Sequence, residues 1–126
     1  MAIVNDLMGA GLPDQAAQRL GYTIASVTSA GSGASDATVI KKAQTVCLVT
    51  TGGASQGVKL PADAELMQPY IIANLTATAA LIYPPTSGQI NGDTATSGTV
   101  PLTARGTTIC YRTGVNAWIA VGGAAG

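Results

Sequence analysis

Apolar side chains recur along this chain with two different spacings, one before residue 22 and another after it. Near the N-terminus, Leu12, Ala16 and Leu20 recur every four residues, which is typical of one face of an α-helix. Pro13 suits the first turn of a helix, so we predict a short helix from Pro13 to Leu20. So short a helix is marginal in water without a packing partner. Residues 1–21 are therefore expected to form an N-terminal arm, which either covers its own domain's core or docks on a neighbouring subunit.

After Gly21, apolar and polar positions alternate, as they do in β-strands with one buried face. Turn residues, among them Pro84-Pro85 and Asn91-Gly92, separate the apolar segments with a rhythm typical of sandwiches and barrels. Segments long enough for crossover helices are absent, which argues against an α/β fold. We predict an all-β fold, a single jelly-roll-like β-sandwich over residues 22–126 that follows the short helical arm. The predicted strands are Tyr22–Thr28, Ala37–Lys41, Thr45–Thr50, Gln56–Leu60, Tyr70–Leu75, Ala79–Tyr83, Gly98–Leu102, Thr107–Arg112 and Asn116–Val121.

The same alternation predicts which side chains share a face of each strand. In the last predicted strand, Trp118 points to the side opposite Ile119. The pairs Ile71-Ile72 and Leu81-Ile82 place apolar side chains on both faces of their strands. A strand that is apolar on both faces is covered on both, and in a small sandwich the outer cover would be another subunit. We therefore expect a homo-oligomer, either a trimer or a dimer.

Composition and charge narrow the classes of partner. The chain has 126 residues, the size of one domain, and only 10% of them are charged. Six basic residues balance six acidic ones, so no electrostatic attraction to nucleic acid or anionic lipid is expected. The first apolar stretch has no preceding Lys or Arg, so we expect no secretory signal. The long uncharged segment between Glu65 and Asp93 contains Pro84-Pro85, so two strands are expected there rather than a membrane helix.

Residues that carry chemistry are few. The chain has no histidine, which excludes Ser-His-Asp and Cys-His catalysis. Cys47 and Cys110 lie in strand-like segments and read as buried thiols, although a disulfide remains open if their strands are neighbours. The segment Gly52–Lys59 (GGASQGVK) superficially looks like a phosphate-binding loop, which needs a lysine directly after its last glycine. Val58 follows Gly57 instead, so the segment does not fit. Asp63 and Glu65 read as loop residues rather than a catalytic pair. We expect a non-enzyme, with no catalytic residue, cofactor or metal.

Three segments carry a resemblance to a known group of proteins. They are GVKLP at Gly57–Pro61, YIIANLTATAALIYPPTSGQING at Tyr70–Gly92, and the strand with Trp118. Together they resemble small structural proteins of tailed bacteriophages, in which a V-x-N strand precedes an L-x-V-Y-P strand, a G-x-I-N-G turn and a closing strand with Trp. The opening Leu7–Pro13 also looks like the start of such proteins, whereas Ile82 departs from the V-Y-P pattern.

The resemblance implies a component of the virion. The expected function is capsid decoration or cementing: the protein would bind the major capsid protein on the capsid exterior, after assembly in the host cytoplasm. It would act by burying apolar surface across neighbouring capsid subunits. The alternatives are a head- or tail-fibre or adaptor module of the virion, and a carbohydrate-binding module that uses Tyr83 and Tyr111. The expected partner contacts are the apolar residues of the arm, Ile3, Leu7, Met8, Leu12 and Leu20.

Overall fold

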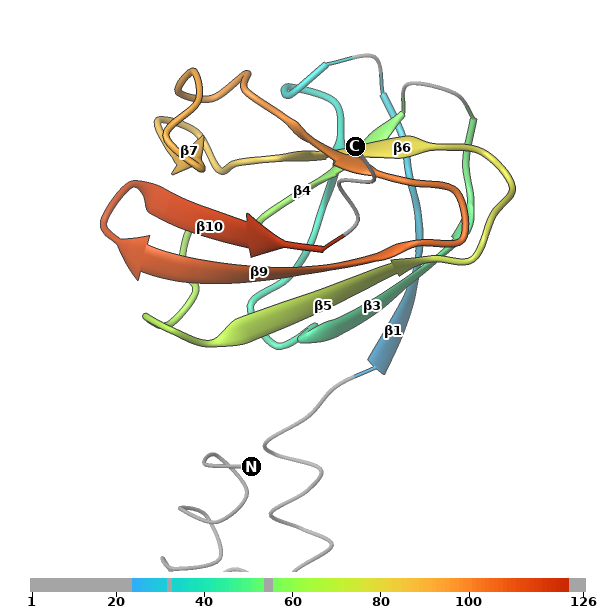
Figure 1. Ribbon diagram of the computed structural model, residues 1–126, viewed down its shortest axis with the longest axis horizontal. Coiled ribbons are helices and arrows are strands. Elements are labelled where there is room, and N and C mark those ends of the chain that lie inside the picture. Colours follow the sequence, from blue (N-terminus) through green and yellow to red (C-terminus); the bar gives the residue numbers. More distant parts are fainter. Residues whose placement is uncertain (1–23, 32, 54–55, 123–126) are drawn as a thin grey trace, which may run out of the picture.

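The computed structural model describes residues 24–31, 33–53 and 56–122, and these residues form two β-sheets without a helix (Figure 1). The all-β prediction is thereby confirmed. The strands are β1 (Ile24–Thr28), β2 (Thr38–Val39), β3 (Val46–Thr51), β4 (Gly57–Lys59), β5 (Pro69–Asn74), β6 (Ala80–Tyr83), β7 (Gln89–Ile90), β8 (Val100–Leu102), β9 (Thr107–Gly114) and β10 (Ala117–Val121).

The first six strands alternate between the two sheets. Strands β1, β3 and β5 lie side by side in parallel in one sheet, and β2, β4 and β6 do the same in the other. Each pair of strands thus makes one turn of a coil, and the next pair stacks on it, which is the path of a β-solenoid. The jelly-roll prediction is wrong, because a jelly roll pairs its strands antiparallel. The chain makes parallel neighbours without crossover helices because it passes through the opposite sheet between them.

The last strands reverse direction and close the structure. Strand β8 pairs antiparallel with β6, and β9 pairs antiparallel with β5. Strand β10 then forms a hairpin with β9, and the two-residue strand β7 adds to β10 in parallel. The result is a six-stranded sheet in the order β1-β3-β5-β9-β10-β7, facing a four-stranded sheet in the order β2-β4-β6-β8.

A single apolar core fills the space between the sheets, and aliphatic side chains make up most of it. Its two aromatic members, Tyr70 and Trp118, pack edge to face with ring centroids 5.9 Å apart. Trp118 is buried and Ile119 is exposed, which confirms the predicted faces of the last strand. Ile72 and Ile82 point into the core, whereas their neighbours Ile71 and Leu81 lie half-buried on the outer faces of the sheets.

The predicted helix from Pro13 to Leu20 and the arm that contains it lie outside the described residues. The same holds for the five predicted contacts, Ile3, Leu7, Met8, Leu12 and Leu20. Among the residues that the structure does describe, no helix is long and apolar enough to cross a membrane.

Candidate functional site

Asn74, the asparagine of the V-x-N-like strand, has a structural role. Its side chain is fully buried, and its amide nitrogen donates hydrogen bonds to the carbonyls of Thr78 (2.8 Å) and Leu102 (3.2 Å). Its Oδ1 accepts from the backbone N–H of Thr76 (3.0 Å). Asn74 therefore closes the turn between β5 and β6 and ties that turn to the end of β8.

The G-x-I-N-G-like segment also has a structural role. Asn91 and Gly92 both have positive φ angles, 54° and 75°, which a tight turn of the primed type requires. The backbone N–H of Asn91 donates to the Trp118 carbonyl (2.9 Å), and its Oδ1 accepts from the backbone N–H of Ala120 (3.0 Å). This turn thus fastens the edge strand β7 to β10.

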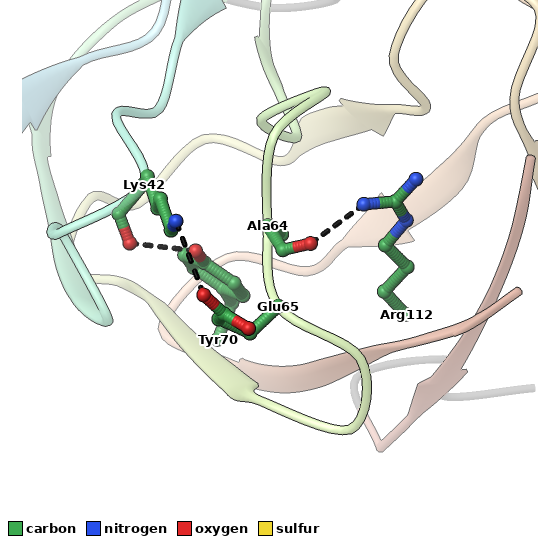
Figure 2. A network of polar contacts seen from close by, with 5 residues as sticks. All are labelled: Lys42, Ala64, Glu65, Tyr70 and Arg112. Carbon is green, nitrogen blue, oxygen red and sulfur yellow. Dashed lines mark hydrogen bonds and ion pairs between the residues drawn. The ribbon is translucent and has the colours of Figure 1, made fainter. Parts of the chain in front are cut away.

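The loops at one end of the six-stranded sheet are fastened by Arg112, near the end of β9. Its Nη1 donates to the Ala64 carbonyl (2.6 Å, Figure 2), its Nε to Gly114 (3.0 Å) and its Nη2 to Val115 (2.8 Å). Its own carbonyl accepts a hydrogen bond from the backbone N–H of Met67 (2.8 Å). One guanidinium therefore joins the loop between β4 and β5 to the β9–β10 hairpin. We call this part of the molecule, residues 64–67 and 114–116, the loop end.

A third loop, between β2 and β3, is joined to the same region. The hydroxyl of Tyr70 donates to the Lys42 carbonyl (2.6 Å), and the Lys42 ammonium lies 3.2 Å from a Glu65 carboxylate oxygen (Figure 2). Burial, with a smaller effect from Asp63, raises the pKa of Tyr70 to about 12, so its hydroxyl stays a donor at neutral pH. The ion pair is exposed and contributes little stability, so the buried tyrosine is the main anchor of this loop.

The loop end holds apolar side chains in solvent. Leu66, Met67 and Val115 are 63%, 61% and 80% exposed. Met67 has a φ of 61°, a left-handed conformation that is costly for a side chain of this kind and persists only when its surroundings hold it. Strand β1 starts at this end of the sheet, since Ile24 pairs with Val46 at the start of β3. The segment with the predicted arm contacts therefore joins the described residues here.

The sequence pattern did not single out Leu66, Met67 or Val115. All three lie in segments with turn residues, where alternation cannot assign a face. Their one visible signal was the presence of large apolar side chains inside predicted loops. Alternation places Arg112 on the same side of its strand as Cys110. The guanidinium reaches the loops because Arg112 lies near the end of β9.

Both cysteines are buried and free. Cys47 lies on β3 and Cys110 on β9, and β5 separates these strands, so the disulfide alternative does not apply. Burial raises the pKa of Cys47 to about 11 and that of Cys110 to about 12, so both thiols are protonated and unreactive at neutral pH.

The other sequence features with possible chemistry lie apart from one another. Asp63 and Glu65 are in the β4–β5 loop, as predicted, and Glu65 pairs with Lys42. Lys59, the last residue of the glycine-rich segment, lies in β4 and donates to the Thr86 hydroxyl (3.2 Å). Within the described residues, no group of three or more His, Cys, Asp or Glu side chains is placed to hold a metal ion.

Comparisons of the chain with protein-family models, with curated proteins and with solved structures find no match.

Proposed function

We propose that this protein is a structural component of a tailed-phage virion that decorates the capsid exterior as a cement protein. It binds the major capsid protein and bridges neighbouring capsid subunits, and its action is passive rather than catalytic. The resemblance of Gly57–Pro61, Tyr70–Gly92 and the Trp118 strand to small phage structural proteins supports this function. Asn74 is buried and Asn91 holds a turn against β10, which agrees with motifs that specify a scaffold rather than an active site.

The observation that carries the proposal is the loop end. It presents Leu66, Met67 and Val115 to solvent on loops that Arg112 holds in place. Loops whose backbone is already held in place lose less conformational entropy on binding, which favours their use as contacts. Burying each of them contributes about 1.5 to 3 kcal/mol at most, so one such end gives a modest affinity. Many copies on a repetitive shell, or a second contact through the arm, would raise the avidity without any new kind of contact.

Co-sedimentation with empty capsid shells of the source phage tests this function. Met67→Asp and Val115→Asp each place a charge in the proposed contact, and we expect each to reduce occupancy on the shell at least tenfold. Leu75→Asp is the matched control, since Leu75 is an exposed apolar residue at the opposite end of β5. Full occupancy with both loop-end variants would contradict the proposed contact.

Deleting residues 1–20 tests the arm separately. If Ile3, Leu7, Met8, Leu12 and Leu20 are contacts, the shortened protein stays folded and loses its binding to shells. Near-ultraviolet circular dichroism would report whether the β-sheets remain packed. Unchanged occupancy after the deletion would show that the arm is not a contact.

A fibre or adaptor module of the virion is the second candidate, and the parallel coil of β1 to β6 favours it. In a solenoid each turn stacks on the previous one, and β1 and β2 are edge strands on the same side of the coil. Further strands from a neighbour could extend both sheets at these edges. A fibre or adaptor occurs in few copies per particle, whereas a cement protein occurs in hundreds, so the copy number separates the two.

No feature of the described residues favours the carbohydrate-binding alternative. Tyr83 is buried, and Tyr111 is half-buried. They lie on different sheets, so they do not form one aromatic platform of the kind that stacks on sugars. A glycan array is the direct test, and a cement protein should bind nothing on it.

A further inference from the structure

The outer face of the six-stranded sheet carries an apolar row that crosses five strands. Strand register places Ile24 beside Val46, Val46 beside Ile71, Ile71 beside Ile109, and Ile109 beside Val121. All five side chains point away from the core, because the residues next to them along each strand pack inside. An uninterrupted row of β-branched side chains is what the inner face of a sandwich normally presents to a facing sheet.

The neighbouring rows of this face continue the apolar character. On one side of the central row, Leu48 lies beside Ala73. On the other side, Pro69 lies beside Tyr111, which lies beside Ile119. We call these three rows the outer face. Its members are Ile24, Val46, Leu48, Pro69, Ile71, Ala73, Ile109, Tyr111, Ile119 and Val121.

The outer face contains no charged side chain. The polar residues among its strands are neutral: Ser26, Thr28, Thr50, Thr107 and Thr113. The outer side of the other sheet differs, since Lys59 lies there between Val39 and Tyr83 in register. A face without charge can be buried against an identical face without like-charge repulsion and without an unpaired buried ion.

The outer face is smaller than a standard protein–protein interface. Five strands spaced about 4.8 Å apart and five residues along each strand enclose about 400 Å², and the ten members of the outer face occupy about two-thirds of that area. Apolar patches of a few hundred Å² are the largest that typical monomers expose, and they are often functional. Standard interfaces bury about 800 Å² of accessible surface per partner, so this face with its rim supplies a reversible contact rather than a permanent one.

We propose that the outer face binds the outer face of a second copy of this chain, in a two-fold symmetric dimer. In such a dimer each copy supplies the cover that the other lacks, and two twisted sheets of the same kind pack at a small angle about 10 Å apart. Each copy contributes two sheets, so the dimer has four stacked sheet layers. The interaction is independent of the loop end, so it stands or fails separately from attachment to a capsid.

Analytical ultracentrifugation of the full chain, without capsid shells, tests the proposal. Over a concentration series we expect a reversible shift from one chain to two, each chain having a mass of 12.5 kDa. Val121→Asp should raise the dissociation constant by on the order of a hundredfold, since it would bury an unpaired charge. Val39→Asp is the matched control: Val39 is 58% exposed and Val121 is 55% exposed, but Val39 lies on the other sheet. That variant should dimerise like the unmodified chain.

Several outcomes would overturn the proposal. A single-chain mass at all concentrations would mean that residues 1–23 or a different protein covers the outer face. A mass of three chains would exclude the two-fold pairing, and a dimer that tolerates Val121→Asp would place the contact elsewhere. Trp118 lies in this sheet with its side chain buried in the core, so its fluorescence verifies that each variant is folded. If Val121→Asp does not fold, Ile119→Asp serves as the second variant on the same face, under the same criteria.

Discussion

Replacing Asn74 with alanine removes the polar centre of the β5–β6 turn. The variant loses the hydrogen bonds from Nδ2 to the carbonyls of Thr78 and Leu102 and the one from the Thr76 N–H to Oδ1. The Thr76 hydroxyl contacts both Asn74 Oδ1 (2.7 Å) and the Thr78 carbonyl (2.9 Å), so it can still satisfy Thr78 after the substitution. The Leu102 carbonyl loses this side-chain donor.

The expected cost follows from these contacts. Three hydrogen bonds at about 1 kcal/mol each amount to about 3 kcal/mol of unfolding free energy. Because Asn74 does not touch the loop end or the outer face, the variant should keep both contact surfaces once folded.

Urea unfolding followed by fluorescence measures this cost. Trp118 is the single tryptophan and is buried, so its emission reports the loss of the core. With a typical urea dependence for a domain of this size, 3 kcal/mol corresponds to a midpoint lowered by about 2 M. Leu75→Ala, at the exposed neighbour, should change the unfolding free energy by less than about 0.5 kcal/mol. A cost below about 1 kcal/mol for Asn74→Ala would refute the assignment of this residue as the centre of the turn.

Three further predictions concern stability. Arg112→Met should lower the unfolding free energy by about 2 kcal/mol in urea, because three carbonyls lose a charged donor; an unchanged midpoint would mean that the loops are held by other contacts. Gly57→Ala should lower the unfolding free energy by about 1 to 3 kcal/mol in the same assay. The new Cβ would lie 2.7 Å from the Tyr83 ring and 2.8 Å from the Leu81 carbonyl. An unchanged unfolding free energy would show that the ring moves aside freely. Burial raises the pKa of Tyr70 to about 12, of Cys47 to about 11 and of Cys110 to about 12, all above their unfolded values. The stability that these three groups contribute is therefore complete below pH 9 and is lost as the pH rises from 9 to 12. Thermal unfolding between pH 8 and 11 checks this, and a melting temperature that stays constant across that range would contradict it.

Local pattern predicted the strands and their faces well, because alternation directly reflects which side chains are buried. Trp118 and Ile119 lie on the sides expected from it, and each predicted strand overlaps a strand of the structure. Strand β7 was missed because its two residues, Gln89 and Ile90, lie within a segment of turn residues and show no alternation of their own. Its pairing with β10 depends on the Asn91 side chain, a contact between distant parts of the chain.

The direction of strand pairing could not be predicted in the same way. Alternation is identical in parallel and antiparallel sheets, and the register of Val46 with Ile71 depends on how the intervening loops cross the core. The residues that make up the outer face could not be predicted for the same reason, because they depend on strand register. The pattern showed that Ile71 and Ile72 lie on opposite faces of their strand, but only strand register shows that Ile71 lies in one row with Ile109 and Val121.

The copy number of this protein in purified virions of its source phage tests the proposed function most directly. Quantitative mass spectrometry would compare it with the major capsid protein in the same particles. Capsid decoration predicts hundreds of copies, close to the number of capsid subunits or a simple fraction of it. A few to a few dozen copies would assign it to a vertex, collar or fibre, and absence from the particle would contradict the virion function altogether.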